Sequence, residues 1–125
     1  MRLITTMLTL LLAYSGALAE WVKVDESENT VFYIDPATIR QEGDIRWLWI
    51  IQDLKKRDGE GGELSRRVQR EFDCRRARHR ILQLTLHSQA MATGEKLAIS
   101  HRLSEWRNVL PGTPVKTIQK IVCDQ

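Results

Sequence analysis

Seven arginines lie within fifteen residues of this chain, and arginine is the side chain best suited to hold anionic groups. They are Arg66, Arg67, Arg70, Arg75, Arg76, Arg78 and Arg80. The planar guanidinium group captures a carboxylate, sulfate or phosphate through two parallel hydrogen bonds, and this stretch contains no lysine. Two interpretations are open: the cluster binds an anionic glycan or an acidic protein, or it covers the solvent face of a sheet.

The second interpretation has a source of counter-charge in the same chain. Residues 20–63 carry 6 basic and 11 acidic side chains, a net charge of −5, whereas residues 64–125 carry 12 basic and 5 acidic ones, a net charge of +7. The arginines could therefore pair with the acidic half of their own domain.

If the cluster binds a ligand, three of its members are the best placed. Arg70 alternates with apolar neighbours, so we expect it to point toward the packed face of a strand and to form a structural ion pair. Arg67 lies on the opposite face, and Arg75 and Arg76 lie near a turn. We therefore predict Arg67, Arg75 and Arg76 as binding residues.

Residue types that carry catalysis are present, but their spacing does not favour it. His79 and His87 would lie about 26 Å apart on one extended strand, which is too far to share a metal. Glu71 and Asp73 share one strand face about 7 Å apart, but their arginine neighbours favour ion pairs over acid/base chemistry. No serine stands in a nucleophile-elbow sequence. We predict a protein that is not an enzyme and holds no metal or cofactor.

Residues 1–19 have the pattern of a cleaved signal peptide, which predicts export to a compartment where disulfides form. The two cysteines, Cys74 and Cys123, allow only one intramolecular pairing, so we predict that they form a disulfide. Cys123 lies in the last turn of a predicted helix, for which Thr113 is the N-cap and Pro114 the first residue. A helix of about ten residues is marginal in isolation. We expect it to pack on a sheet, with the disulfide joining the two.

Strand signals fill most of the chain before this helix. They occur at 21–24, 31–35, 45–54, 67–74 and 82–86, and again from Leu97 onward. In the fifth run the leucines at 82, 84 and 86 alternate with Ile81, Gln83, Thr85 and His87, which we expect to be mostly solvated. The predicted fold class is α+β: an antiparallel sheet of about five to six strands in meander order, packed by a C-terminal helix and carrying one disulfide.

One strand is more apolar than a half-buried strand needs to be. From Trp47 to Ile51 the residues are almost continuously apolar, which indicates that both faces are covered in the middle. One helix cannot cover both faces of a small sheet, and large apolar patches usually mark partner surfaces. We therefore predict a possible homodimer.

The amino terminus predicts export. Residues 1–19 combine Arg2, an apolar run and the small-residue pattern Ala17-Leu18-Ala19, as in a cleaved signal peptide. The remaining residues, 20–125, are expected to form a single periplasmic or secreted domain, for which nucleic acid is a poor partner. Position 20 is Glu20 rather than a lipidated cysteine, so we expect no lipid anchor, and no later apolar run is long enough to span a membrane.

The motifs resemble those of the surface-adhesin protein E family of Gram-negative bacteria. The matching residues are Glu71-Phe72-Asp73-Cys74 with Arg78 and Arg80, the segment Trp106-Arg107-Asn108-Val109-Leu110-Pro111-Gly112-Thr113, Val122-Cys123, Tyr33-Ile34-Asp35 with Thr38-Ile39, and Trp47 with Trp49. The resemblance implies an antiparallel sheet packed by a C-terminal helix, a disulfide between them and a tendency to dimerise. It also implies adhesion to host matrix proteins and epithelial surfaces.

Taken together, these observations predict an exported, non-enzymatic binding domain whose partner is a host matrix protein or an anionic envelope component or glycan. The alternative is a structural or accessory protein of the periplasm that acts by dimerisation or by docking onto an envelope complex.

Overall fold

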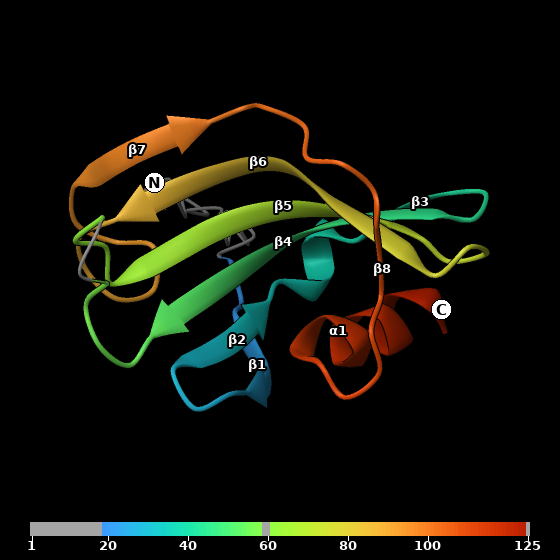
Figure 1. Ribbon diagram of the computed structural model, residues 1–125, viewed down its shortest axis with the longest axis horizontal. Coiled ribbons are helices and arrows are strands. Elements are labelled where there is room, and N and C mark those ends of the chain that lie inside the picture. The colour runs from blue at the N-terminus through green and yellow to red at the C-terminus, as the bar shows by residue number, and fades with distance from the viewer. Residues whose placement is uncertain (1–18, 59–60, 125) are drawn as a thin grey trace, which may run out of the picture.

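The computed structural model of the protein describes residues 19–58 and 61–124, so the predicted leader lies, apart from Ala19, outside the described residues. The described chain forms one antiparallel sheet and one C-terminal helix (Figure 1). The strands are β1 (Val22–Glu26), β2 (Thr30–Ile34), β3 (Arg40–Glu42), β4 (Ile45–Leu54), β5 (Ser65–Asp73), β6 (Arg78–His87), β7 (Lys96–Ser100) and β8 (Arg107–Asn108). The helix is α1 (Pro114–Cys123), and a single 3-10 turn, η1 (Pro36–Thr38), follows β2.

The sheet has meander topology. Its main path runs β1-β2-β4-β5-β6-β7, and every pairing is antiparallel. Each of the two long strands β4 and β6 pairs along one edge with two shorter strands. Next to β2, β3 pairs with the start of β4, and next to β7, β8 pairs with the start of β6. These arrangements make β4, β5 and β6 the rigid centre of the fold.

The predicted fold class is confirmed, but the predicted strand number is too low, because eight strands occur in the described part of the chain. The two additional strands are β3 and β8, with three and two residues. All residues of both strands are exposed, and neither strand is long enough to show the alternation of polar and apolar residues by which a strand is found. Pairing with the long strands β4 and β6 holds these two short strands in place.

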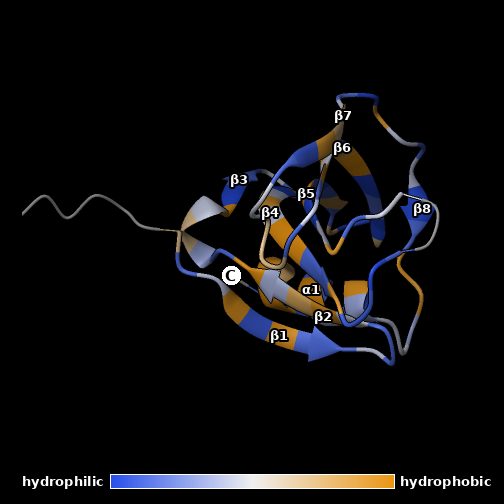
Figure 2. Ribbon diagram, turned by 90° about the vertical axis from the view of Figure 1, so that its left-hand side faces the viewer, coloured by the Kyte–Doolittle hydropathy of each residue, from blue (hydrophilic) through white to orange (hydrophobic). Residues whose placement is uncertain are grey.

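The hydrophobic core lies between one face of the sheet and α1. Its buried members are Ile34, Leu48, Ile50, Phe72, Val109, Ile118 and Val122. The strand residues belong to β2, β4 and β5, and the last two are on the apolar stripe of the helix. Figure 2 shows the strands curving around α1, with β1 and β2 below it and β6 and β7 above it. The helix therefore packs on one face of the sheet, as predicted.

The helix begins and ends as the sequence indicates. The Thr113 side chain accepts a hydrogen bond from the backbone N–H of Lys116 at 3.2 Å, and Pro114 occupies the first turn. Cys123, the last helical residue, forms a disulfide with Cys74 directly after β5, which confirms the predicted pairing. Nε of Arg46 donates to the carbonyl of Val122 at 3.2 Å and so satisfies one of the last carbonyls of the helix.

The apolar strand β4 has different environments on its two faces. Leu48 and Ile50 point toward α1 and are buried in the core, whereas Trp47 and Trp49 lie on the opposite face and are half-buried. Ile51, on that same opposite face, is fully buried. In the described residues no helix is long and apolar enough to cross a membrane.

Candidate binding surface

The arginine cluster is divided by the pleat of the sheet and by one turn. Side chains of a strand alternate between its two faces, so Arg66 and Arg70 of β5 project on the α1 side, and Arg67 projects on the opposite side. Arg78 and Arg80 of β6 share the side of Arg67, because they pair with Asp73 and Glu71. The two remaining arginines, at 75 and 76, lie in the turn that joins β5 to β6.

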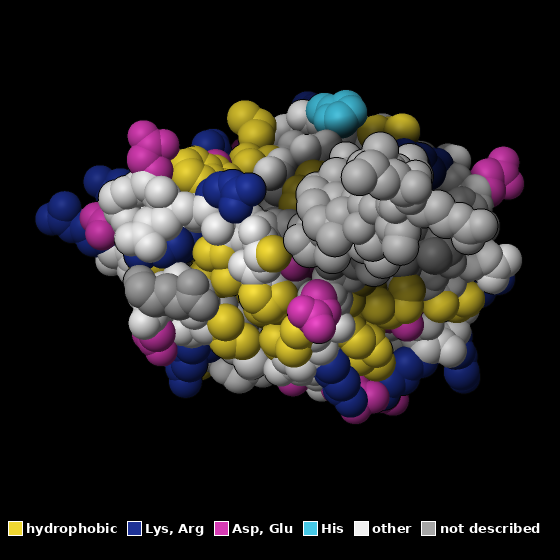
Figure 3. All heavy atoms as spheres, turned by 180° about the vertical axis from the view of Figure 1, so that it is seen from behind, with side chains coloured by type: hydrophobic (Ala, Val, Ile, Leu, Met, Phe, Trp, Pro, Cys, Tyr) yellow, Lys and Arg dark blue, Asp and Glu magenta, His cyan; other side chains and the backbone are white. Residues whose placement is uncertain are grey.

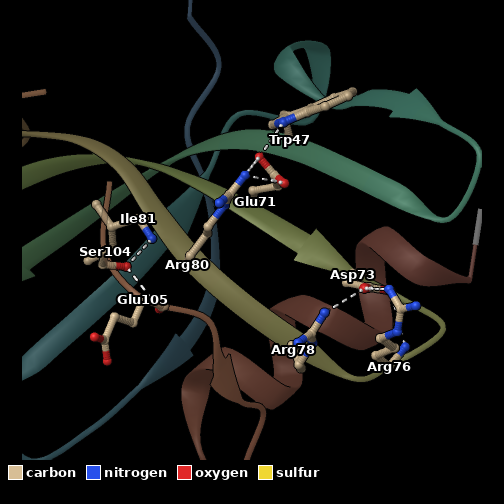
Figure 4. Close-up of polar contacts among 9 residues, drawn as sticks. All are labelled: Trp47, Glu71, Asp73, Arg76, Arg78, Arg80, Ile81, Ser104 and Glu105. Carbon is tan, nitrogen blue, oxygen red and sulfur yellow. Dashed lines mark hydrogen bonds and ion pairs between the residues drawn. The ribbon is translucent and has the colours of Figure 1, made fainter. Parts of the chain in front are cut away.

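On the face opposite α1, Glu71 is the centre of a polar network (Figure 4). Its carboxylate accepts a hydrogen bond from Nε1 of Trp47 at 3.0 Å and forms an ion pair with Arg80 at 3.2 Å. The guanidinium group of Arg80 also lies 4.3 Å from the ring centroid of Trp106, a cation–π contact. This network joins β4, β5, β6 and the segment that leads into β8.

Asp73 organises the turn between β5 and β6. Its carboxylate accepts hydrogen bonds from the backbone N–H of Arg76 at 3.1 Å and from the side chains of Arg76 and Arg78 at 3.3 and 3.4 Å (Figure 4). Burial alone would raise the pKa of this carboxyl, but the hydrogen bonds and charges of Arg76 and Arg78 outweigh it and lower the pKa below its usual value. The predicted ion pairs of Glu71 and Asp73 are therefore present.

Two further arginines are also engaged. Arg66 forms ion pairs of 2.9 Å with both Asp58 and Glu63, which belong to the acidic half of the chain. The guanidinium group of Arg67 lies over the ring of Trp49, 3.9 Å from its centroid. For these two residues the structural interpretation of the cluster explains the side-chain positions.

The three predicted binding residues do not form one site. Arg67 is separated from the end of β5 by six residues, a distance of about 20 Å, and the turn with Arg75 and Arg76 lies beyond that end. Arg75 is exposed and forms no ion pair with any described residue, and the side chain of Arg76 is 67% exposed despite its contact with Asp73. The structure thus brings Arg75 and Arg76 together and leaves Arg67 apart.

Arg70 differs from the expectation of a structural ion pair. It is buried, with 6% exposure, but no carboxylate of the described chain pairs with it. Instead its Nη1 lies 2.6 Å from Nδ1 of His79. Burial lowers the pKa of Arg70 to about 10, and burial together with the charges of Arg70 and Arg107 lowers the pKa of His79 to about 4. Sequence reasoning missed His79 because no periodicity marks a histidine as the neighbour of a buried arginine.

Comparison with known families agrees with this architecture. A profile of the family described as surface-adhesin protein E matches residues 21–124. The chain belongs to the surface-adhesin protein E family. The resemblance seen in the sequence motifs is thereby confirmed.

Solved structures of Haemophilus influenzae protein E have the same fold as this member of the surface-adhesin protein E family. One is superimposed with a TM-score of 0.63 at 15% identity and covers 86% of each chain. A second crystal form gives a TM-score of 0.60 at 15% identity, with 82% of this chain and 96% of that chain covered. Protein E from non-typeable Haemophilus influenzae gives a TM-score of 0.57 at 16% identity, with 84% of each chain covered. Comparison with curated protein sequences gives no significant match.

The surface of this family member opposite α1 combines apolar and charged side chains. Figure 3 shows hydrophobic side chains across the middle of the molecule seen from behind, where its surface is described, with Lys, Arg, Asp and Glu side chains around and among them. Within residues 19–58 and 61–124 no group of three or more His, Cys, Asp or Glu side chains is arranged to hold a metal ion. The described side chains of this face form ion pairs and cation–π contacts.

Proposed function

We propose that this member of the surface-adhesin protein E family is an exported, non-enzymatic domain that binds an anionic glycan or an acidic protein surface. The observation that carries the proposal is the exposed pair Arg75–Arg76 in the turn between β5 and β6. With Arg78 the turn has three arginines against the single carboxylate of Asp73, so a net positive charge remains for a partner.

The turn is tied to the rest of the fold at both Asp73 and Cys74. The backbone of Arg76 is fixed by Asp73, and the neighbouring Cys74 is bonded to Cys123 of α1. Ala77 has a positive φ of 50°, so the turn closes through a left-handed residue. A preorganised turn loses little conformational entropy on binding, which favours affinity.

Retention on immobilised heparin at two salt concentrations tests this proposal. The double substitution Arg75→Ser with Arg76→Ser should strongly reduce retention at low salt and leave the fold and the disulfide intact. Raising the salt concentration should also reduce the retention of the wild-type protein, because exposed charges are screened. Arg67→Ser, about 20 Å away, tests whether the third predicted residue contributes separately.

A matched control removes the same charge elsewhere. Lys96 of β7 and Lys120 of α1 are exposed, and their replacement by Ser also lowers the net charge by two. If this control loses as much retention as the arginine variant, total charge explains the binding and the turn is not the site. Unchanged retention of a correctly folded arginine variant would also refute the proposal.

The second candidate function is that of an accessory envelope protein that acts by self-association, and β7 favours it. This strand pairs with β6 along one edge, every residue in it is exposed, and Leu97 and Ile99 are 40% and 55% exposed. No strand of the described chain pairs with the other edge of β7, and an unpaired apolar edge is a surface on which a strand of a second copy can pair. We propose the homodimer here rather than at β4, whose apolar residues are buried or half-buried within the chain.

Light scattering tests the homodimer. A dimer mass for the wild-type protein and a monomer mass for Ile99→Lys would support association through β7, since a charged edge disfavours strand pairing. Cell fractionation then separates the two functions. An adhesin must reach the outside of the cell, whereas an accessory protein stays in the periplasm.

A further inference from the structure

On the α1 side of the sheet, a cavity of about 320 Å³ lies between β6, the segment before β8 and the first turn of α1. Its lining residues are Arg70, His79, Ile81, Ser104, Arg107 and Val115. An adjoining cavity of about 560 Å³ shares three of these residues with it and adds Trp106 and Leu110 on its wall. The two together have the size of a small-molecule site.

The inner cavity contains a buried cation without a counter-charge. Arg70 is 6% exposed, and its Nε atom forms no hydrogen bond within the described chain. Neither Asp nor Glu is among the described residues that line the two cavities. A buried charge is costly unless it is paired, so this guanidinium group is poised to accept an anion.

The hydrogen bond between Arg70 and His79 determines which ring nitrogen of the histidine carries its proton. A guanidinium group only donates hydrogen bonds, so Nδ1 of His79 must be the acceptor in the 2.6 Å contact. The proton of a neutral His79 is then on Nε2, which leaves this N–H as a second donor. Burial, together with charge repulsion from Arg70 and Arg107, lowers the pKa of His79 and so keeps the ring neutral at physiological pH.

The opposite walls are mostly apolar, and hydrogen bonds to the backbone of β6 hold them in place. Ser104 accepts a hydrogen bond from the backbone N–H of Ile81 at 2.8 Å, which fixes the segment before β8 against β6 (Figure 4). Val115 lines both cavities from the first turn of α1, and Leu110 is 60% exposed at the wall of the outer one. Such walls suit hydrocarbon or an aromatic ring rather than a fully hydrated anion.

We propose that these joined cavities bind a small organic carboxylate. The carboxylate group pairs with Arg70 and Arg107 in the inner cavity and accepts the Nε2–H of His79. The apolar or aromatic body of the ligand lies along Val115, Leu110 and Trp106 in the outer cavity. Arg70 and His79 lie on the sheet face opposite Arg67, and neither Arg75 nor Arg76 lines either cavity.

Titration with phenylacetate, followed by NMR of the Trp106 indole N–H, tests the proposal. Phenylacetate should bind in the millimolar range or tighter and shift this signal, and the neutral isostere phenylacetamide should bind at least about tenfold more weakly. Inorganic phosphate should not compete, because it offers nothing to the apolar walls. Equal binding of acid and amide, or equal binding of phosphate, would overturn the assignment of a carboxylate site.

Two variants locate the site. Arg107 is exposed in β8 and makes no ion pair with a described residue, so Arg107→Gln should fold normally and weaken phenylacetate binding by about tenfold or more. Arg102→Gln, in the same segment but outside both cavity walls, is the matched control and should bind like the wild type. Unchanged affinity in Arg107→Gln, or an equal loss in Arg102→Gln, would refute the site. Arg70→Gln should abolish binding if it folds.

Discussion

Glu71 of β5 and Trp47 of β4 lie directly opposite each other in the sheet, and the carboxylate of one accepts the indole N–H of the other at 3.0 Å. Glu71 is only 7% exposed, so its carboxylate is largely shielded from solvent. Its second oxygen pairs with Arg80, which compensates the charge. Together, Glu71, Trp47 and Arg80 therefore join three neighbouring strands, β4, β5 and β6.

We expect Glu71→Ala to lower the free energy of unfolding by about 2 kcal/mol, because it leaves the half-buried Arg80 without its acid and Trp47 without its acceptor. Denaturant unfolding measures the loss. Glu105→Ala, an exposed residue, is the control and should change stability by less than about 0.5 kcal/mol. Similar values for the two variants would show that the network does not stabilise the sheet.

Asp73→Ala should lower the free energy of unfolding by about 2 kcal/mol at neutral pH, since the turn loses three charge-assisted hydrogen bonds. The pKa of Asp73 lies below its ordinary value of 3.8 in the folded state. Its contribution is therefore complete above about pH 3.8 and is lost as the pH falls through the lowered pKa. Thermal unfolding of both proteins should converge in acid. A constant difference at all pH values would contradict this account.

His79 should make the protein sensitive to mild acid. Its pKa is lowered from 6.5 to about 4 in the folded state. As the pH falls, His79 is therefore protonated in the unfolded chain before it is protonated in the folded protein. The stability due to neutral His79 is complete above about pH 6.5 and is lost as the pH falls toward about 4. In His79→Gln, whose side-chain oxygen can still accept from Arg70, the loss of stability over this window should be smaller. Identical pH profiles of the melting temperature would rule out His79 as the responsible group.

Cys123→Ser should lower the free energy of unfolding by about 2 to 5 kcal/mol, because the Cys74–Cys123 bridge closes a loop with a sequence separation of 49. The reduced wild-type protein should lose a similar amount and serves as the control. Two titratable thiols in denatured protein taken from its native compartment would show that the bridge does not form there.

Local sequence was sufficient for the longer elements of the fold, but not for β3 and β8. Runs of β-favouring residues and alternation marked the six longer strands, and Thr113-Pro114 marked the start of α1, because capping and helical periodicity depend on residues a few positions apart. The disulfide followed from the predicted export and from number, since Cys74 and Cys123 are the only cysteines. These features need no knowledge of distant neighbours.

Local periodicity does not predict the bulge between β5 and β6. Gln69 pairs with Gln83 but the next residue, Arg70, pairs with Ile81, so Leu82 is the extra residue. An extra residue reverses the alternation, and Ile81 therefore lies on the α1 side with Arg70 instead of on the face of Gln83. His87, expected to be solvated, is 4% exposed.

The arrangement of charged groups was likewise decided only by the tertiary structure. Arginines that look like one cluster in the sequence are divided among two faces and a turn, because neighbouring strand positions point in opposite directions. Arg70 meets His79 nine positions away, and Arg107 joins them from a two-residue strand that exists only beside β6. The sequence determined the elements because they depend on local periodicity. The folded chain determined which charges meet, since that depends on register and on long-range packing.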